Sequence, residues 1–300
     1  MEAVRQAIEL PVTKRHGVIL TLKREDLLFP LLSGNKFRKL KYNLEYARKE
    51  GYQTLLTFGG AFSNHLHATA AAGKHYGFRT IGLVRGEELA ERPLNPTLAS
   101  ARENGMQLEF VSRETYRRKA GQPFLEFLQA RFGPVFILPE GGTNERAVRG
   151  CEEILGEADQ QFSHICCPVG TGGTLAGLAR SARPDQRVLG YPALRAEGLE
   201  AELRSWIPGA DWRLVGEFHF GGYGKVNREL VDFINAFRKA AGVPLDPVYT
   251  GKMMYGILEG IRRQDFPEGS RILAVHTGGL QGIAGMNMRL KKKNLPLLHL

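Results

Sequence analysis

The sequence predicts an α/β protein with two lobes, because short apolar segments typical of buried strands alternate with amphipathic segments typical of helices. The connections between these segments are short, which favours parallel sheets covered by helices on both faces. A length of 300 residues exceeds one typical domain and falls short of three. We expect a large domain of residues 1–49 and 146–300 and a small α/β domain of residues 50–145.

The first 32 residues are predicted to form an extended lead-in with one strand at residues 17–23, before a helix that ends near Gly51. In the small domain, strands and helices are predicted to alternate along residues 54–58, 63–76, 79–84, 96–104, 107–111, 122–132, 134–138 and from about 144. The second half repeats this alternation, with strands at residues 163–169, 187–191 and 271–276 and helices from 174 and at 199–206, 227–241 and 252–263.

The net charge of +10 raises the alternative of a nucleic-acid-binding protein. The basic residues are spread along the chain, however, and the one tight run, residues 289–294, lacks interleaved aromatic residues. We interpret that run as a solvated helix end and expect no nucleic-acid partner. The positive balance also favours an anionic cofactor and carboxylate substrates.

The sequence indicates neither a membrane span nor a secreted protein. No apolar run approaches the roughly eighteen residues of a membrane-spanning helix, and the N-terminus lacks the apolar stretch of a signal peptide. We therefore expect no membrane partner and a cytoplasmic location. Cys151, Cys166 and Cys167 do not have the spacing of zinc ligands, so we interpret them as small core residues and expect no metal site.

Residues 33–40, Ser-Gly-Asn-Lys-Phe-Arg-Lys-Leu, combine a tight turn with the start of a helix. Lys36 therefore falls in the first helical turn, where the positive end of the helix dipole disfavours a cation. An amine in that position loses its proton more easily, and a neutral amine is the nucleophile that forms imines with carbonyl compounds. A solvated surface lysine is the alternative that this stretch leaves open.

The segment 169–174, Val-Gly-Thr-Gly-Gly-Thr, follows a buried strand and precedes a helix. Gly172 and Gly173 allow backbone N–H groups to converge on an anion, and Thr171 and Thr174 add hydroxyls at the positive helix end. The segment has neither the lysine of a nucleotide P-loop nor the spacing of a dinucleotide fingerprint. It predicts a phosphate-binding turn, with a plain strand–helix turn as the alternative.

A second strand–turn–helix segment spans residues 59–65, Gly-Gly-Ala-Phe-Ser-Asn-His. Ser63 or Asn64 can simply cap the helix. Functionally, Asn64 offers an amide donor to a phenolate-like oxygen, and Ser63 offers a hydroxyl and the helix-start field to a carboxylate. His65 and His67 are two residues apart, so they point to different faces of a helix and are poor joint metal ligands.

Two tyrosines and a threonine lie in glycine-containing loops. Tyr223 and Tyr249 can anchor turns, or they can act as acids, bases or stacking partners in a cleft. Thr277 follows the last predicted strand, and ligands of parallel α/β sheets bind at that end of a strand. An enzyme that holds pyridoxal phosphate as a lysine imine needs four features. These are a first-turn lysine, a phosphate-binding turn, a donor to the phenolate oxygen and hydroxyls around the ring, and the sequence offers all of them.

These motifs resemble the 1-aminocyclopropane-1-carboxylate deaminase/D-cysteine desulfhydrase family, which belongs to the fold-type II (tryptophan synthase β-like) pyridoxal-phosphate enzymes. The resemblance runs in order from about Leu22 to Gly282. The motifs that carry it are Ser-Gly-Asn-Lys-Phe-Arg-Lys at 33–39, Gly-Gly-x-x-Ser-Asn-His at 59–65, Gly-Thr-Gly-Gly-Thr at 170–174, Asp-Pro-Val-Tyr-Thr-Gly-Lys at 246–252 and His-Thr-Gly-Gly at 276–279.

The resemblance implies pyridoxal 5′-phosphate as the cofactor, bound by the large domain. It implies that Lys36 forms the imine, that Lys39 and the loop Thr171–Thr174 hold the phosphate, and that Asn64 bonds the 3′ oxygen. Thr277 would lie near the ring nitrogen. The role of Arg38 is left open at this stage.

For catalysis, the resemblance implies that Ser63 meets the substrate carboxylate or transfers a proton, and that Tyr223 and Tyr249 flank the ring and the substrate. The expected partners are a small amino acid as substrate and a second copy of the chain in a homodimer.

Two departures from the family pattern bear on the substrate. Thr250 stands where the deaminases carry Glu, as it does in the desulfhydrases, and Phe62 stands where Gln is frequent. We therefore expect a lyase that eliminates the β substituent of a small amino acid, giving pyruvate, sulfide and ammonia from D-cysteine. The alternatives are a 1-aminocyclopropane-1-carboxylate deaminase, a D-serine-type dehydratase or racemase, and a pyridoxal-phosphate-binding protein with little turnover.

Overall fold

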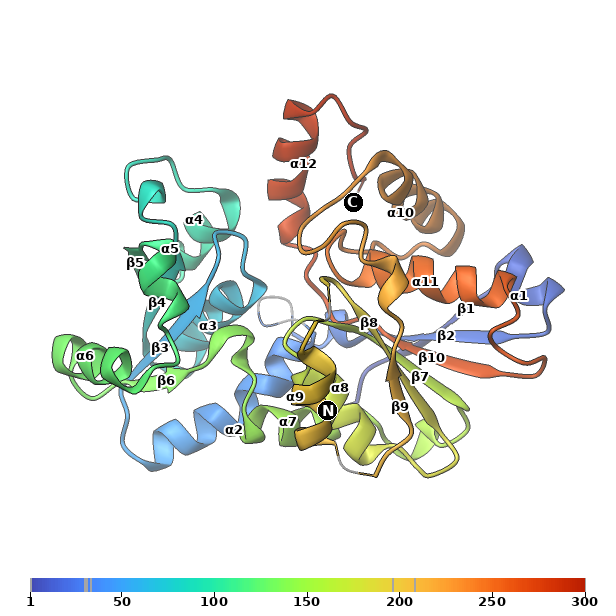
Figure 1. Ribbon diagram of the computed structural model, residues 1–300, viewed down its shortest axis with the longest axis horizontal. Helices are drawn as coiled ribbons and strands as arrows, with labels where there is room; N and C mark the ends of the chain where they lie inside the picture. Colours follow the sequence, from blue (N-terminus) through green and yellow to red (C-terminus); the bar gives the residue numbers. More distant parts are fainter. Residues whose placement is uncertain (1, 30–31, 33, 196, 208, 300) are drawn as a thin grey trace.

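The computed structural model describes residues 2–29, 32, 34–195, 197–207 and 209–299, and each of its two lobes is built on one sheet (Figure 1). The larger sheet has the order β1 (Arg5–Ile8), β2 (Ile19–Lys23), β10 (Arg271–Val275), β7 (His164–Val169), β8 (Arg187–Pro192) and β9 (Trp212–Leu214). The smaller sheet has the order β5 (Met106–Val111), β4 (Arg79–Arg85), β3 (Thr54–Gly59) and β6 (Phe136–Leu138). Neighbouring strands are parallel except β1, which pairs antiparallel with β2.

The helices cover both sheets. They are α1 (Pro11–Arg15), α2 (Asn35–Lys49), α3 (Asn64–Tyr76), α4 (Pro96–Glu103), α5 (Arg113–Arg117), α6 (Gln122–Phe132), α7 (Glu145–Glu152), α8 (Gly173–Ser181), α9 (Leu199–Trp206), α10 (Arg228–Ala241), α11 (Thr250–Arg262) and α12 (Gly282–Lys292). Short 3-10 turns occur at Glu25–Leu27, Glu87–Leu89, Glu140–Gly142, Glu157–Asp159 and Gly216–Phe218. No helix in the described part of the chain combines the length and apolar character that crossing a bilayer requires.

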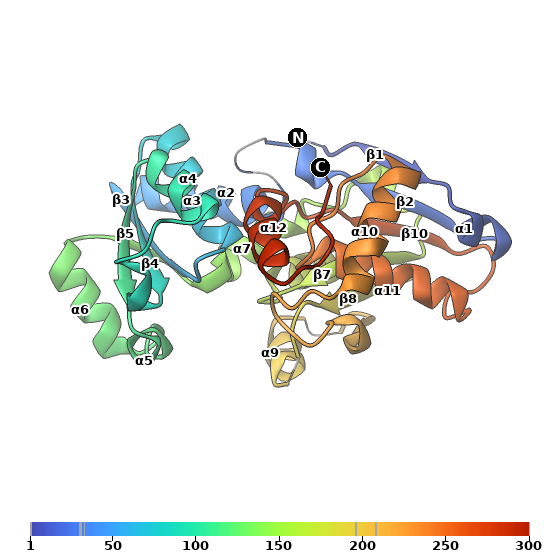
Figure 2. The ribbon, with the colours of Figure 1, turned by 90° about the horizontal axis from the view of Figure 1, so that it is seen from above.

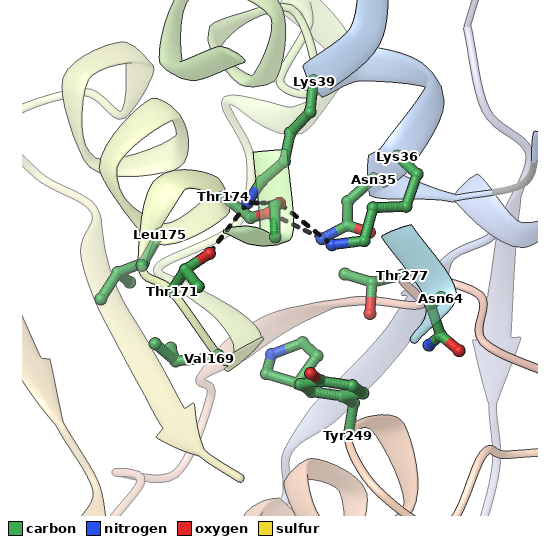
Figure 3. Close-up of a pocket in the computed structure, with 14 residues that line it drawn as sticks. Asn35, Lys36, Lys39, Asn64, Val169, Thr171, Thr174, Leu175, Tyr249 and Thr277 are labelled. Carbon is green, nitrogen blue, oxygen red and sulfur yellow. Dashed lines mark hydrogen bonds between the residues drawn. The ribbon is translucent and has the colours of Figure 1, made fainter. Parts of the chain in front are cut away.

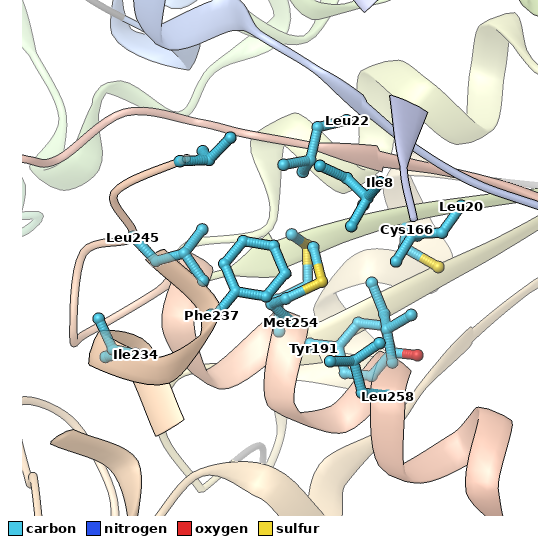
Figure 4. Close-up of a cluster of buried hydrophobic side chains, with 14 of the residues drawn as sticks. Ile8, Leu20, Leu22, Cys166, Tyr191, Ile234, Phe237, Leu245, Met254 and Leu258 are labelled. Carbon is cyan, nitrogen blue, oxygen red and sulfur yellow. The ribbon is translucent and has the colours of Figure 1, made fainter. Parts of the chain in front are cut away.

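The large sheet is buried on both faces, and alternate residues of its central strands enter different cores. Ile272 and Ala274 of β10 pack with α10, α11 and α12, whereas Leu273 and Val275 pack with α7, α8 and α9. Figure 4 shows the first of these cores, to which Cys166 also belongs. All three cysteines are free and buried, which confirms that they are core residues. Two-sided burial explains why these strands are continuously apolar in sequence.

Helix α2 connects the two lobes. Its residues Leu40, Leu44 and Ala47 pack into the core of the small lobe together with α3 and β6. On its other side, Gly150 of α7 allows a close approach, because a Cβ there would collide with the Arg38 carbonyl. The four-stranded sheet lies within the residues assigned to the small domain, while the boundaries near residues 50 and 145 stay a prediction.

The two-lobed α/β architecture is as predicted, but the prediction missed several elements. β1, α1, α5 and β9 were not expected, and of α12 only the end was expected. The missed strands and α1 have only three to five residues, too few to display a period. Helix α12 contains Gly282 and Gly285, which weakened its signal, although the basic run does coincide with its end. Ser33, part of the lysine motif, lies outside the described residues.

Candidate active site

A pocket between the lobes lies where α2, α3 and α8 begin, beyond the carboxyl ends of β3, β7 and β10. It brings together predicted site residues from distant parts of the chain (Figure 3). Those that line it are Lys36, Lys39, Asn64, Thr171, Gly172, Thr174, Tyr249 and Thr277. Gly173 begins α8 beside this pocket. Ser63 and Tyr223 line a second pocket, which shares Asn64 and Tyr249 with the first.

One end of the first pocket is built for an anion. Lys39 is buried, and its Nζ donates to Thr143 Oγ1 at 2.9 Å, to the Gly141 carbonyl at 3.1 Å and to Thr171 Oγ1 at 3.4 Å. The N-cap of helix α8 is Gly172, whose φ of +80° only glycine adopts readily, and no side chain caps the helix. Its first turn contains no acidic residue, so the free N–H groups and the helix field favour an anion.

Small residues keep this anion-binding end open. A Cβ at Gly173 would lie 2.9 Å from Thr143 Oγ1 and 3.2 Å from Lys39 Nζ. Thr143 was missed in the sequence, although it follows Gly141-Gly142 after a strand, the same signal that identified the other turns. Asn35 Nδ2 donates to Thr174 Oγ1 at 2.8 Å and so joins the starts of α2 and α8.

Lys36 lies in the first turn of α2, as predicted, and its side chain extends into the pocket (Figure 3). Its Nζ lies 3.5 Å from the Gly141 carbonyl oxygen. Burial holds the pKa of Lys36 well below its usual value, and the nearby charge of Lys39 lowers it further. The helix dipole predicted this direction from the sequence, but burial is the main cause of the shift. A neutral amine in this position is the nucleophile that a carbonyl cofactor requires.

Asn64 and Thr277 also line the pocket. Gln281 Nε2 donates to Asn64 Oδ1 at 2.6 Å, which leaves the Asn64 amide nitrogen as the group that can donate to a ligand. Thr277 is held by the turn before α2, because Gly34, with φ of +73°, packs directly against the Thr277 carbonyl. The position of Gln281 was missed because only the tertiary structure brings it to Asn64.

Thr250 lies beneath the pocket and does not line it. Its hydroxyl donates to Asp246 Oδ1 at 2.8 Å. The Asp246 carboxylate also accepts from the backbone N–H groups of Val248, Tyr249 and Thr250 at 2.7 to 3.0 Å. Asp246 therefore fixes the start of α11 and the position of Tyr249.

The two tyrosines meet where the pockets join. The rings of Tyr223 and Tyr249 lie edge to face with centroids 6.1 Å apart. Lys252 holds the loop that carries Tyr223, since its Nζ donates to the carbonyls of Ala193, His219 and Gly222 at 2.8 to 3.1 Å. Burial lowers the pKa of Lys252 to about 8 and raises the pKa of Tyr249 well above its usual value, so the Tyr249 phenol stays protonated.

Arg38 and the two histidines near the pocket contact other protein groups and do not line the pocket. Arg38 is buried and pairs with Glu25, with Nε to Oε2 at 2.9 Å and Nη2 to Oε1 at 3.0 Å. His65 is buried against Gly142, and burial together with Lys36 and Lys39 lowers its pKa well below the usual value. His67 Nε2 instead lies 3.1 Å from Ser100 Oγ. Within the described residues, no group of three or more His, Cys, Asp or Glu is arranged to hold a metal ion.

The donor set fits a phosphorylated carbonyl cofactor. The buried Lys39, the half-buried Lys36, the uncapped start of α8 and the space left by Gly173 form one cradle, and the Asn64 amide also lines the pocket. Phosphate favours such a helix start, and a lysine with a depressed pKa favours a covalent bond to an aldehyde. The fold and this site define a fold-type II pyridoxal-phosphate enzyme.

Comparison with known proteins identifies the family. The family model described as pyridoxal-phosphate dependent enzyme matches residues 6–278, and the chain belongs to this family. A solved structure described as an ACC deaminase homologue superimposes with a TM-score of 0.84 at 27% identity, covering 97% of this chain and 94% of that chain. Threonine deaminase isoform 2 from Solanum lycopersicum, at 18% identity and a TM-score of 0.68, shares the fold, covering 98% of this chain and 82% of that chain.

The curated relatives carry the names of both activities in the family that the sequence resembles. A D-cysteine desulfhydrase from Salmonella schwarzengrund is 30% identical, over 88% of this chain and 87% of the relative. A Pyrococcus horikoshii protein provisionally named 1-aminocyclopropane-1-carboxylate deaminase is 30% identical, over 90% of this chain and 87% of the relative. The predicted family, fold-type II class and cofactor are confirmed: the protein is a pyridoxal-phosphate-dependent lyase or deaminase acting on a small amino acid.

Proposed function

We propose that the protein catalyses α,β-elimination on a small amino acid, with D-cysteine giving pyruvate, sulfide and ammonia as the first reaction to test. One observation carries the proposal. Of the described residues that line the cofactor pocket, none is Asp or Glu, and the Thr250 hydroxyl is bonded to Asp246. The individual roles of the site residues below are part of the proposal.

The absence of a lining carboxylate bears on the reaction type. Bound pyridoxal phosphate withdraws electrons from the α carbon of the amino acid, most strongly when an acid faces its ring nitrogen. Thr277 and Tyr249 line the pocket instead and offer hydroxyls without negative charge. Elimination of a β substituent needs less charge on the ring than opening a cyclopropane, because the leaving group carries the electron pair away. This supports elimination over ring opening.

Different residues of the chain would bind the phosphate, accept the proton and bond the 3′ oxygen. Lys39 and the N–H groups at the start of α8 would hold the phosphate. The Lys36 amine, which loses its proton more readily than an ordinary lysine because burial lowers its pKa, would accept the proton from the α carbon. The Asn64 amide nitrogen would bond the 3′ oxygen of the cofactor, while its oxygen stays bound to Gln281.

On the substrate side, Ser63 lies at the first turn of α3 and would receive the α-carboxylate. Tyr249 would cover the ring, and its protonated phenol would serve as a hydrogen-bond donor. Tyr223, from the loop held by Lys252, would close the substrate side. These groups orient the bond to the β substituent and exclude water from the α carbon.

The test is a substrate panel on the purified, cofactor-loaded protein. Pyruvate and sulfide from D-cysteine would support the proposal, and 2-oxobutyrate from 1-aminocyclopropane-1-carboxylate would favour the deaminase alternative. Products of D-serine would favour the dehydratase or racemase alternative. A yellow protein that releases none of these products would favour a cofactor-binding protein with little turnover.

The role of Lys36 is tested in the same assay. Lys36→Ala should remove the absorption band of the covalently bound cofactor and lower kcat about a thousandfold, because the nucleophile and the base are lost together. Lys49→Ala, at the exposed end of the same helix, is the matched control and should leave both unchanged. Full activity of Lys36→Ala would contradict the assignment.

We also propose a homodimer, as the family resemblance implies, and a cytoplasmic location. Light scattering of the purified protein tests the first, and fractionation of the source cells tests the second.

A further inference from the structure

The second pocket carries an unusual charge. It adjoins the cofactor pocket through Asn64 and Tyr249 and contains two arginines, Arg85 at the end of β4 and Arg289 on α12. One arginine comes from each lobe, and α12 lies where the lobes meet, packed against α4 (Figure 2). Arg85 also stands at the carboxyl end of a parallel strand, where ligands of such sheets bind.

Neither arginine is neutralised. Within the described residues, no carboxylate lies within ion-pair distance of Arg85 or Arg289, whereas twelve other arginines form such pairs: Arg5, Arg24, Arg38, Arg113, Arg118, Arg131, Arg180, Arg183, Arg187, Arg204, Arg262 and Arg263. Two unpaired guanidinium groups, both exposed to solvent, therefore give the pocket more positive charge than the one carboxylate that lines it, Asp246, can offset.

Two acids in this region, Asp246 and Glu140, already bond to other groups. Asp246, which lines the pocket, accepts three backbone N–H groups and the Thr250 hydroxyl. Glu140 accepts from the Tyr116 hydroxyl at 2.7 Å and pairs with Lys119 at 3.1 Å. The Arg85 guanidinium lies 5.7 Å from the centre of the Tyr116 ring, which orients it without neutralising its charge.

One side of the pocket is apolar, while Ser63, Asn64, Tyr223 and Tyr249 add polar groups elsewhere in its lining. Phe62 packs against α12 at Gly285, where a Cβ would lie 2.6 Å from the Phe62 ring, and Val248 and Met286 complete this side. The pocket thus offers an oxyanion two guanidinium forks, which match sulfonate and phosphate geometry, whereas a neutral thiol cannot use their charge.

We propose that this pocket receives the substrate side chain, and that Arg85 and Arg289 select amino acids whose β substituent is a sulfonate or phosphate ester. The proposal rests on the elimination proposed above. The α-proton is removed, the bond from Cβ to sulfur or to the ester oxygen breaks, and the electron pair leaves with the oxyanion. With one water, the amino acid becomes pyruvate, ammonium and hydrogen sulfite or hydrogen phosphate.

Kinetics on the holoenzyme tests the selection. Both enantiomers of cysteate, O-phosphoserine and cysteine are compared by pyruvate release, and kcat/KM should be at least about tenfold higher for an oxyanionic substrate than for cysteine. The cysteate and phosphoserine arms tell sulfonate from phosphate. Arg85→Gln and Arg289→Gln should each reduce the ratio of kcat/KM, oxyanionic substrate over cysteine, about tenfold or more.

Arg102→Gln on α4 is the matched control, because Arg102 is exposed and outside the pocket, and it should leave the ratio unchanged. A ratio that neither pocket variant changes would overturn the proposal. Rising ionic strength should also lower the wild-type preference for the oxyanion, which requires no variant.

Calorimetry measures whether the pocket prefers an oxyanion, and it does so without requiring turnover. 3-Sulfopropanoate, which has no amino group and cannot react, should bind the holoenzyme at least about tenfold more tightly than propanoate, and Arg85→Gln and Arg289→Gln should remove this difference. Equal affinity of the two acids would overturn the proposal. If no amino acid releases pyruvate but the affinity difference holds, the elimination is wrong and the oxyanion pocket stands.

Discussion

Helices α3 and α8 both begin after a glycine turn at the end of a parallel strand, yet only α3 has a side-chain N-cap. Ser63 caps α3, with its Oγ accepting from the Leu66 N–H at 3.2 Å. The N-cap of α8 is Gly172, and no side chain caps that helix. The uncapped start is the one beside the buried Lys39. A helix start that the protein leaves unsatisfied beside a buried cation indicates a place reserved for an anion.

The start of α2 extends the comparison. Its N-cap is Gly34, again without a side-chain cap, and its first turn contains no acid but does contain Lys36. The two uncapped starts therefore face the cofactor region with the positive ends of their helix fields, and the capped start faces the substrate side. In α3 a side chain satisfies a free N–H group of the first turn. In α2 and α8 no side chain does so, and these N–H groups can bind a ligand.

The largest expected effect comes from making α8 resemble a capped helix. Thr171→Asp places a carboxylate at the start of α8 next to Lys39, where the phosphate is proposed to bind. The dissociation constant of pyridoxal phosphate should rise at least about a hundredfold, because the new charge repels the phosphate and occupies Lys39. The free energy of unfolding of the apoprotein should rise by about 0.3 to 1 kcal/mol, because a carboxylate suits a helix start.

Thr171→Asn provides the uncharged control of similar size. Absorption titration with the cofactor and urea unfolding of the apoprotein measure the two effects separately. If Asn weakens binding as much as Asp, the role of α8 as an anion site is wrong.

A smaller effect is expected at the capped helix. Ser63→Ala should lower the free energy of unfolding by about 1 kcal/mol through loss of the cap. Ser63→Asp restores the cap but places a negative charge toward the substrate carboxylate, so it should recover stability while kcat/KM stays low. Ser112 caps α5, away from both pockets, by accepting from the Thr115 N–H at 3.0 Å. Ser112→Ala should therefore cost similar stability and leave kcat/KM unchanged; a Ser63→Asp variant with wild-type kcat/KM would restrict Ser63 to capping.

The same comparison explains what the sequence could reveal. Glycine turns at strand ends identified Thr171, Asn64 and Thr277, because local chain geometry demands those residue types. Lys36 was placed correctly in a first turn, but its low pKa comes mainly from burial, which depends on the packing of both lobes.

The residues that the sequence did not reveal act across the fold. Gln281 binds Asn64 from 217 positions along the chain, and Arg85 and Arg289 share a pocket only because the lobes meet there. No local pattern marks such pairs, since each member looks like an ordinary surface residue. Thr143 is different, because its glycine turn was visible in the sequence, whereas its contact with Lys39 appears only in the structure.

The smallest expected effect is a change in pH dependence at the start of α2. Burial and the charge of Lys39 both lower the pKa of Lys36, and only the neutral amine attacks an aldehyde. In the apoprotein, the rate of reaction with pyridoxal, which lacks the phosphate, should therefore rise with pH at a midpoint below that of an ordinary lysine. Lys39→Gln removes the second cause and should move this midpoint upward, while burial still keeps it below the ordinary lysine value. Lys49→Gln, at the far end of α2, is the control for a general loss of positive charge. A midpoint that Lys39→Gln leaves in place, or moves down, would mean that Lys39 serves the phosphate alone and that burial by itself keeps Lys36 neutral.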